Sequence, residues 1–435
     1  MPDLSFALRA LRARNYRLFF TGQGISLIGT WMTRIAMSWL VYRLTGSAVL
    51  LGIVGFAGQI PAFVLGPIAG VWVDRLDRHR TVIVTQVFSM LQSLALAALA
   101  LANVITVAEI IWLALAQGLI NAFDMPARQA FMIQMIEQRE DLGNAIALNS
   151  SMVNAARLVG PAVAGVVVAA VGEGYCFLID GISYIAVIVS LLMMRVERRS
   201  VAKAQRRAMQ ELVEGWEYVT RSIPIRTILL NLSIVSLFGM PYSVLMPVFA
   251  SNILHGGAHT LGFLMASSGI GALIGAITLA ARRSVVGLGR RIVITTAMFG
   301  AAVIAFSFSP WLWLSLLILP FVGYGMMQQM AASNTILQTI VHDEKRGRVM
   351  AFYSMAFQGM APFGSLLAGS AAARWGAPVT VFASGLACLA GALWFYRSLR
   401  AIREVVRPIY VKLGIIPELA IGVQEASALG EPPEG

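Results

Sequence analysis

Four charged side chains stand in or at the end of long apolar stretches of this chain: Arg34, Asp124, Arg157 and Asp180. A charge near the centre of a bilayer is costly, so it normally faces a partner or a cavity and marks a substrate or proton pathway. Arg157 lies near the middle of an apolar stretch over 144–171. It either holds an anionic substrate or is locked to a carboxylate or to helix carbonyls. Arg34 and Asp180 lie at similar depths toward the same side, which favours a buried ion pair.

Acidic residues are distributed unevenly along the chain. No Asp or Glu occurs between Glu217 and Asp343, or between Glu344 and Glu404. The apolar stretches of the second half therefore carry no carboxylate. If protons drive an activity through a buried acid, that acid lies in the first half. The candidates are Asp180, which we rank first, and then Asp124 and Asp74.

Apolar segments must position these residues. The chain is 58% hydrophobic and 12% charged, whereas soluble domains average about 45–50% apolar and 25% charged residues. A transmembrane helix needs about 20 largely apolar residues. Segments of that kind run at 17–42, 47–73, 80–102, 107–124, 144–171, 175–194, 226–250, 260–281, 291–309, 311–336, 349–373 and 377–397. The sequence therefore predicts an all-α membrane protein with twelve transmembrane helices.

The second half of the chain repeats the first with an offset of 204 positions. Matched pairs include Gly160 with Gly364, Gly165 with Gly369, and Gly172 with Gly376. A duplicated helical bundle is the usual architecture of a secondary transporter, which handles its substrate between the halves. We expect two pseudo-symmetric six-helix bundles at 1–194 and 226–399, a linker at 195–225 and a tail at 400–435.

Basic residues indicate the orientation in the membrane. Of the 33 Lys and Arg residues, 29 fall on one side of the predicted spans, and only Arg43 and Arg374 fall in loops on the other side. This is the positive-inside pattern, which predicts cytoplasmic termini in a multi-pass protein of a bacterial inner membrane. The first apolar stretch has full span length and no cleavage site, so no cleavable signal peptide is expected.

The linker and the tail differ in pattern. Apolar residues recur in the linker at helical spacing, from Met209 to Val219, and predict an amphipathic helix on the inner membrane surface. A helix that docks a partner is the alternative. The tail loses its pattern after Pro408, and residues 422–435 have a disordered composition.

Thioethers, aromatic rings and amides gather on segments that could line a central cavity. Together with Arg157, the cavity candidates are Gln117, Asn121, Asn154, Tyr242, Met246, Tyr324 and Gln328. Such side chains suit a bulky amphipathic ligand. For any single one of them, filling a gap in helix packing is the alternative.

One loop carries a family resemblance. The run Gly70-Val-Trp-Val-Asp74-Arg75-Leu-Asp77-Arg78-His79-Arg80 closes the second apolar segment and opens the third. It resembles the signature loop of the major facilitator superfamily, with Asp77 in place of the usual second glycine. The resemblance implies a cytoplasmic gate that includes Arg75 and latches the two halves together.

The parts of this gate have separate physical expectations. Gly70 permits close helix approach, and Asp74 would face the N-terminus of the eleventh helix near Gly347, where an anion is favoured. Arg78 would pair with Asp124. The alternative is a topogenic basic loop that contacts nothing.

Two further stretches resemble parts of that superfamily. Gly160-Pro161-Ala-Val-Ala-Gly165 resembles the helix-five signature of antiporters and predicts a hinge that bends and packs closely. The phrases at 39–47 and 211–218 resemble the branch that contains the enterobactin exporter and macrolide-efflux proteins. The resemblance implies export of an amphipathic small molecule, drug-like or siderophore-like, by proton antiport and alternating access. The alternatives are a lysophospholipid or nutrient transporter, or a non-transporting membrane sensor or scaffold.

Other chemistries have little support in the sequence. It contains no Walker loop and no nucleophile–base pair. His255 and His259 have no third ligand nearby, and Cys176 and Cys388 lie on apolar segments of opposite halves. We therefore expect no enzyme, no cofactor, no metal and no disulfide. The expected partners are a small-molecule substrate, protons and the lipid bilayer, with no nucleic acid, and the chain is expected to be a monomer.

Overall fold

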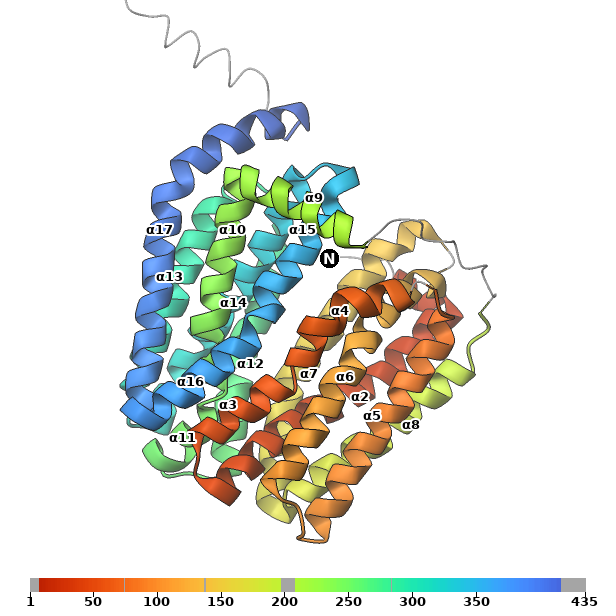
Figure 1. Cartoon of the computed structure of the whole chain (residues 1–435), viewed down its shortest axis with the longest axis vertical. Coiled ribbons are helices and arrows are strands. Elements are labelled where there is room, and N and C mark those ends of the chain that lie inside the picture. The colour runs from red at the N-terminus through yellow and green to blue at the C-terminus, as the bar shows by residue number, and fades with distance from the viewer. Residues whose placement is uncertain (1–7, 74, 137, 197–207, 283, 416–435) are drawn as a thin grey trace, which may run out of the picture.

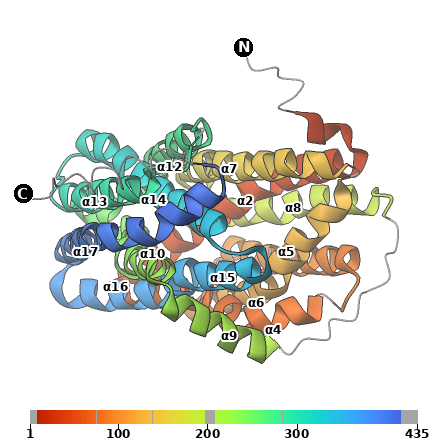
Figure 2. The same cartoon turned by 90° about the horizontal axis from the view of Figure 1, so that it is seen from above.

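The computed structural model describes residues 8–73, 75–136, 138–196, 208–282 and 284–415. These ranges are helical almost throughout and contain no β-strand. Twelve helical rods form two bundles, one from each half of the chain, which lie side by side (Figure 1 and Figure 2). The predicted fold class is confirmed.

The first bundle contains six rods, the second of which is built from two consecutive helices. The rods are α2 (Arg14–Thr45), α3 (Ala48–Ala57) with α4 (Ile60–Val73), α5 (Arg78–Leu101), α6 (Val107–Met132), α7 (Leu142–Val171) and α8 (Glu173–Leu192). The fourth rod passes its predicted end at residue 124 and continues through Pro126 to Met132.

The second bundle begins with an irregular rod. Its parts are α10 (Ile223–Ile234), a π-helical turn (Val235–Gly239), a 3-10 turn (Met240–Ser243), α11 (Met246–Val248) and a second π-helical turn (Phe249–Ile253). Pro241 and Pro247 each lack the backbone N–H that an α-helix interior requires, which accounts for the interruptions. The sequence had predicted one continuous segment over 226–250.

The other five rods of the second bundle follow the predicted segments closely. They are α12 (Ala258–Ala280), α13 (Leu288–Ser307), α14 (Leu312–Ile340), the composite rod of α15 (Asp343–Ser354), a π-helical turn (Met355–Gly359) and α16 (Ala361–Trp375), and α17 (Ala377–Lys412). The last rod passes residue 399, the predicted end of the bundle, and continues through Pro408. The residues 422–435 lie outside the described part of the chain.

Ten helices of the described chain are long and apolar enough to cross a membrane. The two rods beyond this set are α2 and the composite α15–α16 rod. Each carries charge: α2 contains Arg14, Arg17 and Arg34, and α15 opens with the run Asp343-Glu-Lys-Arg. They complete the twelve rods.

The sequence repeat corresponds to a repeated turn. Gly172 and Gly376 precede the last rods of their halves, α8 and α17, and have backbone φ angles of 95° and 84°. Residues other than glycine rarely adopt a backbone conformation with a positive φ angle. The offset of 204 residues therefore relates two positions with the same conformational requirement.

Matching glycines also bring the two bundles together. A Cβ added to Gly165 of α7 would lie 2.9 Å from the Cα of Gly262 in α12. A Cβ added to Gly369 of α16 would lie 3.0 Å from the Cα of Gly52 in α3. Small residues allow this close backbone approach between membrane helices. The contact of α7 with α12 is thus repeated, by pseudo-symmetry, in the contact of α16 with α3.

The two ends of the molecule differ in how the bundles meet. We call the end that carries α9 (Ala208–Arg221) and α15 the α9 end, and the opposite one the α3 end (Figure 1). At the α3 end, one apolar cluster contains residues of both halves, from Met32 to Cys388. At the α9 end each half has its own apolar cluster. The bundles are therefore joined at the α3 end.

Glycines show the same asymmetry. Near the α9 end, an added Cβ on Gly66, Gly70, Gly143 or Gly347 would meet no heavy atom of the described chain within 4 Å. At the α3 end the matched glycines touch the opposite half directly. In this conformation Gly70 therefore has open space beside it, and the close helix approach that it permits stays a prediction.

The linker helix α9 packs on the second bundle. Arg348 Nη1 donates to Glu214 Oε2 at 2.6 Å, and the Lys345 ammonium lies 4.6 Å from the centre of the Tyr218 ring. Gly215 leaves room for Phe352, since a Cβ there would lie 2.9 Å from the ring. α9 is therefore attached to α15.

Candidate functional site

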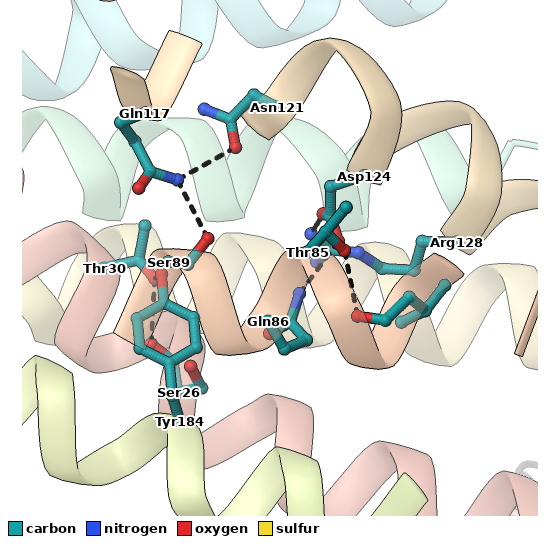
Figure 3. Close-up of polar contacts among 11 residues, drawn as sticks. Ser26, Thr30, Thr85, Gln86, Ser89, Gln117, Asn121, Asp124, Arg128 and Tyr184 are labelled. Carbon is teal, nitrogen blue, oxygen red and sulfur yellow. Dashed lines mark hydrogen bonds and ion pairs between the residues drawn. The ribbon is translucent and has the colours of Figure 1, made fainter. Parts of the chain in front are cut away.

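A line of polar side chains runs through the first bundle between α2, α5, α6 and α8, and most of it is drawn in Figure 3. Its members are hydroxyl residues, amides, two buried carboxylates and one arginine. We call this set the polar seam: Ser26, Thr30, Thr85, Gln86, Ser89, Ser93, Gln117, Asn121, Asp124, Arg128, Asp180 and Tyr184. Polar groups inside an apolar bundle are costly unless they are hydrogen-bonded, so such a seam indicates a functional interior.

Asp124 anchors one end of the seam. Its Oδ1 accepts hydrogen bonds from Thr85 Oγ1 and Gln86 Nε2, both at 2.8 Å, and its Oδ2 forms an ion pair with Arg128 (Figure 3). Arg128 lies one turn further along α6, so the pair forms within one helix. The predicted partner was Arg78, at the start of α5. The ion pair that the structure shows for Asp124 is made by Arg128 instead.

Amides and hydroxyls continue the seam away from Asp124. Gln117 Nε2 donates to Ser89 Oγ and to Asn121 Oδ1, both at 3.2 Å. Thr30 and Tyr184 share a hydrogen bond of 3.4 Å between their hydroxyls (Figure 3). Gln117 and Asn121 therefore lie together, as cavity candidates should, and Gln117 also contacts α5 of the first bundle.

Asp180 is the second carboxylate of the seam and is 1% exposed. Ser93 Oγ donates to its Oδ2 at 2.8 Å, while its Oδ1 is buried with no hydrogen-bond partner among the described residues. Gly29 of α2 makes room for this oxygen, since an added Cβ would lie 2.8 Å from it. Asp180 is thus a buried acid without a cation beside it in the described chain.

The predicted ion pair between Arg34 and Asp180 does not form in this structure. Asp180 packs against Gly29, and Arg34 follows five residues later on α2, which is about 140° around an α-helix. Arg34 therefore lies about 7.5 Å further along α2 than the position against which Asp180 packs, and on another face of that helix. The similar depth expected from the sequence was too coarse to imply contact.

Arg34 lies instead against an aromatic ring that it shares with Arg157. The guanidinium carbons of Arg34 and Arg157 lie 4.9 Å and 5.2 Å from the centre of the Trp31 ring. Nε and Nη1 of Arg157 are buried and have no hydrogen-bond partner in the described residues. A cation–π contact contributes about 0.5–2 kcal/mol, whereas the penalty for a buried charge is several kcal/mol. The ring therefore offsets only part of this penalty.

The predicted hinge residues fix this arrangement. Gly160 lies directly against the Trp31 side chain and the Ile28 carbonyl of α2. Pro161 and Gly165 face α12, where an added Cβ on Gly262 would lie 2.7 Å from the Pro161 oxygen. α7 is helical from Leu142 to Val171 with Pro161 inside it. Close packing at this segment is observed, and bending during activity stays a prediction.

Two of the second-half candidates are bound within their own bundle. Gln328 is fully buried: its Oε1 accepts from Arg291 Nε at 2.8 Å, and its Nε2 donates to the Gly275 oxygen at 2.8 Å. Arg291 Nη2 also donates to the Tyr324 hydroxyl at 3.0 Å. Tyr324 and Gln328 are therefore occupied by a network between α12, α13 and α14. Their role as substrate contacts stays a prediction.

The other three cavity candidates, Tyr242, Met246 and Asn154, also pack or bond within the described chain. Tyr242 is hydrogen-bonded to Ser268 through their hydroxyls at 2.8 Å, and Ser268 adjoins Gly269, which packs against Arg157 and Leu158 of α7. Met246 is fully buried in the apolar cluster shared by both halves. Asn154 donates to the Ser150 carbonyl of its own helix at 2.8 Å. Asn154 lies one turn from Arg157 on α7, and Tyr242 reaches the opposite side of the α7–α12 contact through Ser268.

The predicted gate loop is only partly described. Asp74 lies outside the described residues, and Arg75 is exposed. The eleventh rod begins at Asp343, before the Gly347 that we expected near its start. Asp77, the departure from the family pattern, caps α5 by accepting a hydrogen bond from the Arg80 backbone N–H at 3.3 Å. The latch stays a prediction.

Sequence reasoning missed several residues of these sites. Arg128 carried a signal in its spacing of four from Asp124, and Trp31 in its spacing of three from Arg34. Ser93 and Tyr184 had none, because serine and tyrosine inside an apolar segment do not reveal which helix they face.

Comparison with known proteins agrees with this architecture. The model of the transmembrane secretion effector family, a branch of the major facilitator superfamily, matches residues 5–407. The chain is 25% identical over 381 residues to the staphyloferrin A transporter of Staphylococcus aureus, covering 87% of this chain and 95% of the relative. It is 28% identical over 373 residues to the multidrug efflux pump Tap of Mycolicibacterium fortuitum, covering 83% and 90%. It is also 24% identical to macrolide efflux protein A of Streptococcus pyogenes, covering 61% and 67%.

Solved structures share the fold. A bacterial homologue of the human lysosomal transporter Spinster, in an inward-facing and unoccupied conformation, superposes with a TM-score of 0.66 at 13% identity, covering 90% of this chain and 98% of that one. The nucleoside transporter NupG gives a TM-score of 0.67 at 13% identity, covering 89% and 99%. The chain belongs to the transmembrane secretion effector family of the major facilitator superfamily, and it is a multi-pass membrane transporter of small molecules rather than an enzyme.

Proposed function

We propose that this transporter exports an amphipathic small molecule, drug-like or siderophore-like, in exchange for protons. It does so by alternating access, as a monomer in a bacterial inner membrane, with both termini and α9 in the cytoplasm. The names of its relatives support export and the substrate class. The basic residues that crowd the predicted cytoplasmic loops support the orientation.

The asymmetry of the two ends supports alternating access. With the α9 end in the cytoplasm, this conformation is joined on the outside and separate on the inside, because the shared apolar cluster lies at the α3 end. The separate clusters at the α9 end allow the bundles to move as units. Closing that end, with the Asp74 loop as the cytoplasmic gate, would accompany opening of the α3 end.

One observation carries the proton coupling: Asp180 is a buried carboxyl with no cation beside it in the described chain. An ionised carboxylate is costly in such a place, and a protonated one is not. Asp180 also touches three rods, through Gly29 in α2, Ser93 in α5 and its own α8. Uptake and release of a proton there changes the charge where these rods meet, which is a means to bias their packing.

The test is a flux assay with the purified protein in proteoliposomes. A panel of amphipathic drugs and siderophores is offered with and without an imposed pH gradient, and internal pH is followed with a trapped dye. We expect accumulation of at least one compound that depends on the gradient and proton movement that depends on the compound. Compound movement at the same rate with and without the gradient would contradict antiport and leave a facilitator.

A further inference from the structure

Two arginines from different rods meet at one indole ring. Arg34 of α2 and Arg157 of α7 both lie about 5 Å from the centre of the Trp31 ring. Both guanidinium groups carry a charge at any pH at which the cell lives. Like charges that share a ring repel one another, so this arrangement lacks a negative partner.

No acid of the membrane rods in the described chain supplies that partner. Glu109 is used in the capping box that starts α6, Asp124 pairs with Arg128, and Glu173 pairs with Arg43 at 2.7 Å. Asp180 faces Ser93 and Gly29. The second half has no acid between Glu217 and Asp343, nor between Glu344 and Glu404.

Hydrogen bonding is equally incomplete. Nε and Nη1 of Arg157 are buried and bond to nothing in the described structure. Arg34 makes no ion pair or hydrogen bond with the described residues, and its side chain is accessible. An arginine with a purely structural role would donate these N–H groups to carboxylates or backbone carbonyls. No such hydrogen bond from Nε or Nη1 of Arg157 supports a structural role for this residue.

The paired arginines lie where the halves meet. An added Cβ on Gly269 of α12 would lie 3.3 Å from the Arg157 carbonyl oxygen and 3.0 Å from the Leu158 Cα. The neighbouring Ser268 shares a hydrogen bond of 2.8 Å with the Tyr242 hydroxyl, which places Tyr242 beside this contact between α12 and α7. A ligand on these arginines would therefore touch rods of both bundles, which is the position from which it can bias their arrangement.

From these observations we propose that Arg34, Arg157 and Trp31 form the binding site for an oxyanion of the transported molecule, so that the substrate is an acidic amphipath. The guanidinium forks present paired N–H donors that match a carboxylate or a phosphate. On the facing bundle, the hydrogen-bonded pair of Ser268 and Tyr242 presents hydroxyl groups beside the same helix contact. The inference rests on the proposed transport function and adds the chemical class of the cargo.

Binding in detergent tests the site without requiring transport. The probe is dansyl-leucine, compared with its methyl ester, which has the same apolar body without the negative charge. Fluorescence anisotropy should give an affinity for the acid at least about tenfold above that for the ester. Arg34→Gln and Arg157→Gln should each lower the affinity for the acid about tenfold. The two Lys variants should lose less, because an ammonium keeps the charge but not the fork.

Competition then identifies the oxyanion. Decanoate, decyl phosphate and decyltrimethylammonium, below their micellar concentrations, compete against dansyl-leucine. We expect one or both anions to displace the probe and the cation not to. Preference for decanoate assigns a carboxylate, and preference for decyl phosphate assigns a phosphate such as that of a lipid headgroup. Displacement by the cation alone would overturn the proposal.

The matched control is Arg43→Gln. It removes an arginine that lies near the C-terminus of the same helix, α2, and pairs with Glu173, and it should leave probe binding unchanged.

A second measurement, thermal unfolding, distinguishes a binding site from a structural role. If the two arginines form a binding site, Arg34→Gln or Arg157→Gln removes one of two repelling charges and should leave Tm unchanged or raise it. If an arginine instead stabilises the fold, its removal should lower Tm. Equal affinity for acid and ester, or unchanged affinity for the acid in the Arg34→Gln/Arg157→Gln protein, would refute the site. Normal binding without gradient-driven flux would instead count against the proposed antiport alone.

Discussion

Gly369 of α16 and Gly52 of α3 are in backbone contact across the two halves: a Cβ on Gly369 would lie 2.6 Å from the Ala48 carbonyl oxygen and 3.0 Å from the Gly52 Cα. Gly165 and Gly262 form the pseudo-symmetric contact. Glycine at these positions is therefore a requirement of the closed α3 end, because any side chain would hold the halves apart.

Gly369→Ala should weaken closure of the α3 end. Spin labels at Thr45 and Arg374, which are exposed near that end, should show a longer or broader distance distribution, and transport should fall severalfold. The matched control is Gly143→Ala, where an added Cβ meets no described atom within 4 Å and helix propensity improves by up to about 1 kcal/mol. The same distance distribution in both variants would show that the glycine contact does not set the closure.

Asp180→Asn should abolish accumulation driven by a pH gradient while leaving substrate binding and downhill exchange measurable. The amide keeps the shape and the Ser93 contact but has no proton to exchange. Flux with and without the gradient, in the same proteoliposomes, measures the effect. Glu109→Gln, an acid used only to cap α6, serves as the control. Gradient-driven accumulation by the Asn variant would exclude Asp180 as the coupling residue.

Asp124→Asn and Arg128→Gln should each destabilise the first bundle, and their effects should not add. Removing one partner of a fully buried pair costs about 3–5 kcal/mol. Here the Arg128 side chain is 27% exposed, so we expect about 1–3 kcal/mol for each variant. Denaturant unfolding of the single and double variants forms the cycle. Full additivity would show that the two charges act independently.

Orientation can be tested with single cysteines at described, exposed positions. Glu217→Cys in α9 should react with a membrane-impermeant maleimide only after the cells are opened. His255→Cys, in the loop before α12, should react in sealed cells. Cys176 and Cys388 are buried and should remain silent. The reverse labelling pattern would invert the topology, and with it the assignment of the gate.

The sequence predicted the helical architecture well because its signals are long and redundant. Full-length apolar segments, the glycine repeat and the signature loop each point to the same fold. Helix edges failed mainly at prolines. The fourth segment was predicted to end at residue 124, yet α6 continues through Pro126 to Met132, which places Arg128 one turn from Asp124.

Side-chain partners were harder to predict because depth and spacing do not define the rotation of a helix. Asp180 packs against Gly29, whereas Arg34 lies about 1.4 turns further along α2 and on another face of it, so the predicted pair did not form. The sequence also did not show that Arg291, on a neighbouring rod, is hydrogen-bonded to Tyr324 and Gln328. Spacing within one helix would have been a usable signal, because Trp31 and Arg34 are three residues apart and in contact, but it was not used.

The distribution of the apolar clusters has a thermodynamic consequence. The cluster that includes Met32, Phe249 and Phe306 is common to both halves, so opening the α3 end must divide it and expose apolar surface. Exposure of apolar surface to water raises the heat capacity. Closing the α9 end in the same step buries surface there, so the sign of the net heat-capacity change reports which of the two ends exchanges more apolar surface with water. A curved van't Hoff plot of the conformational equilibrium, measured without substrate, would give that sign.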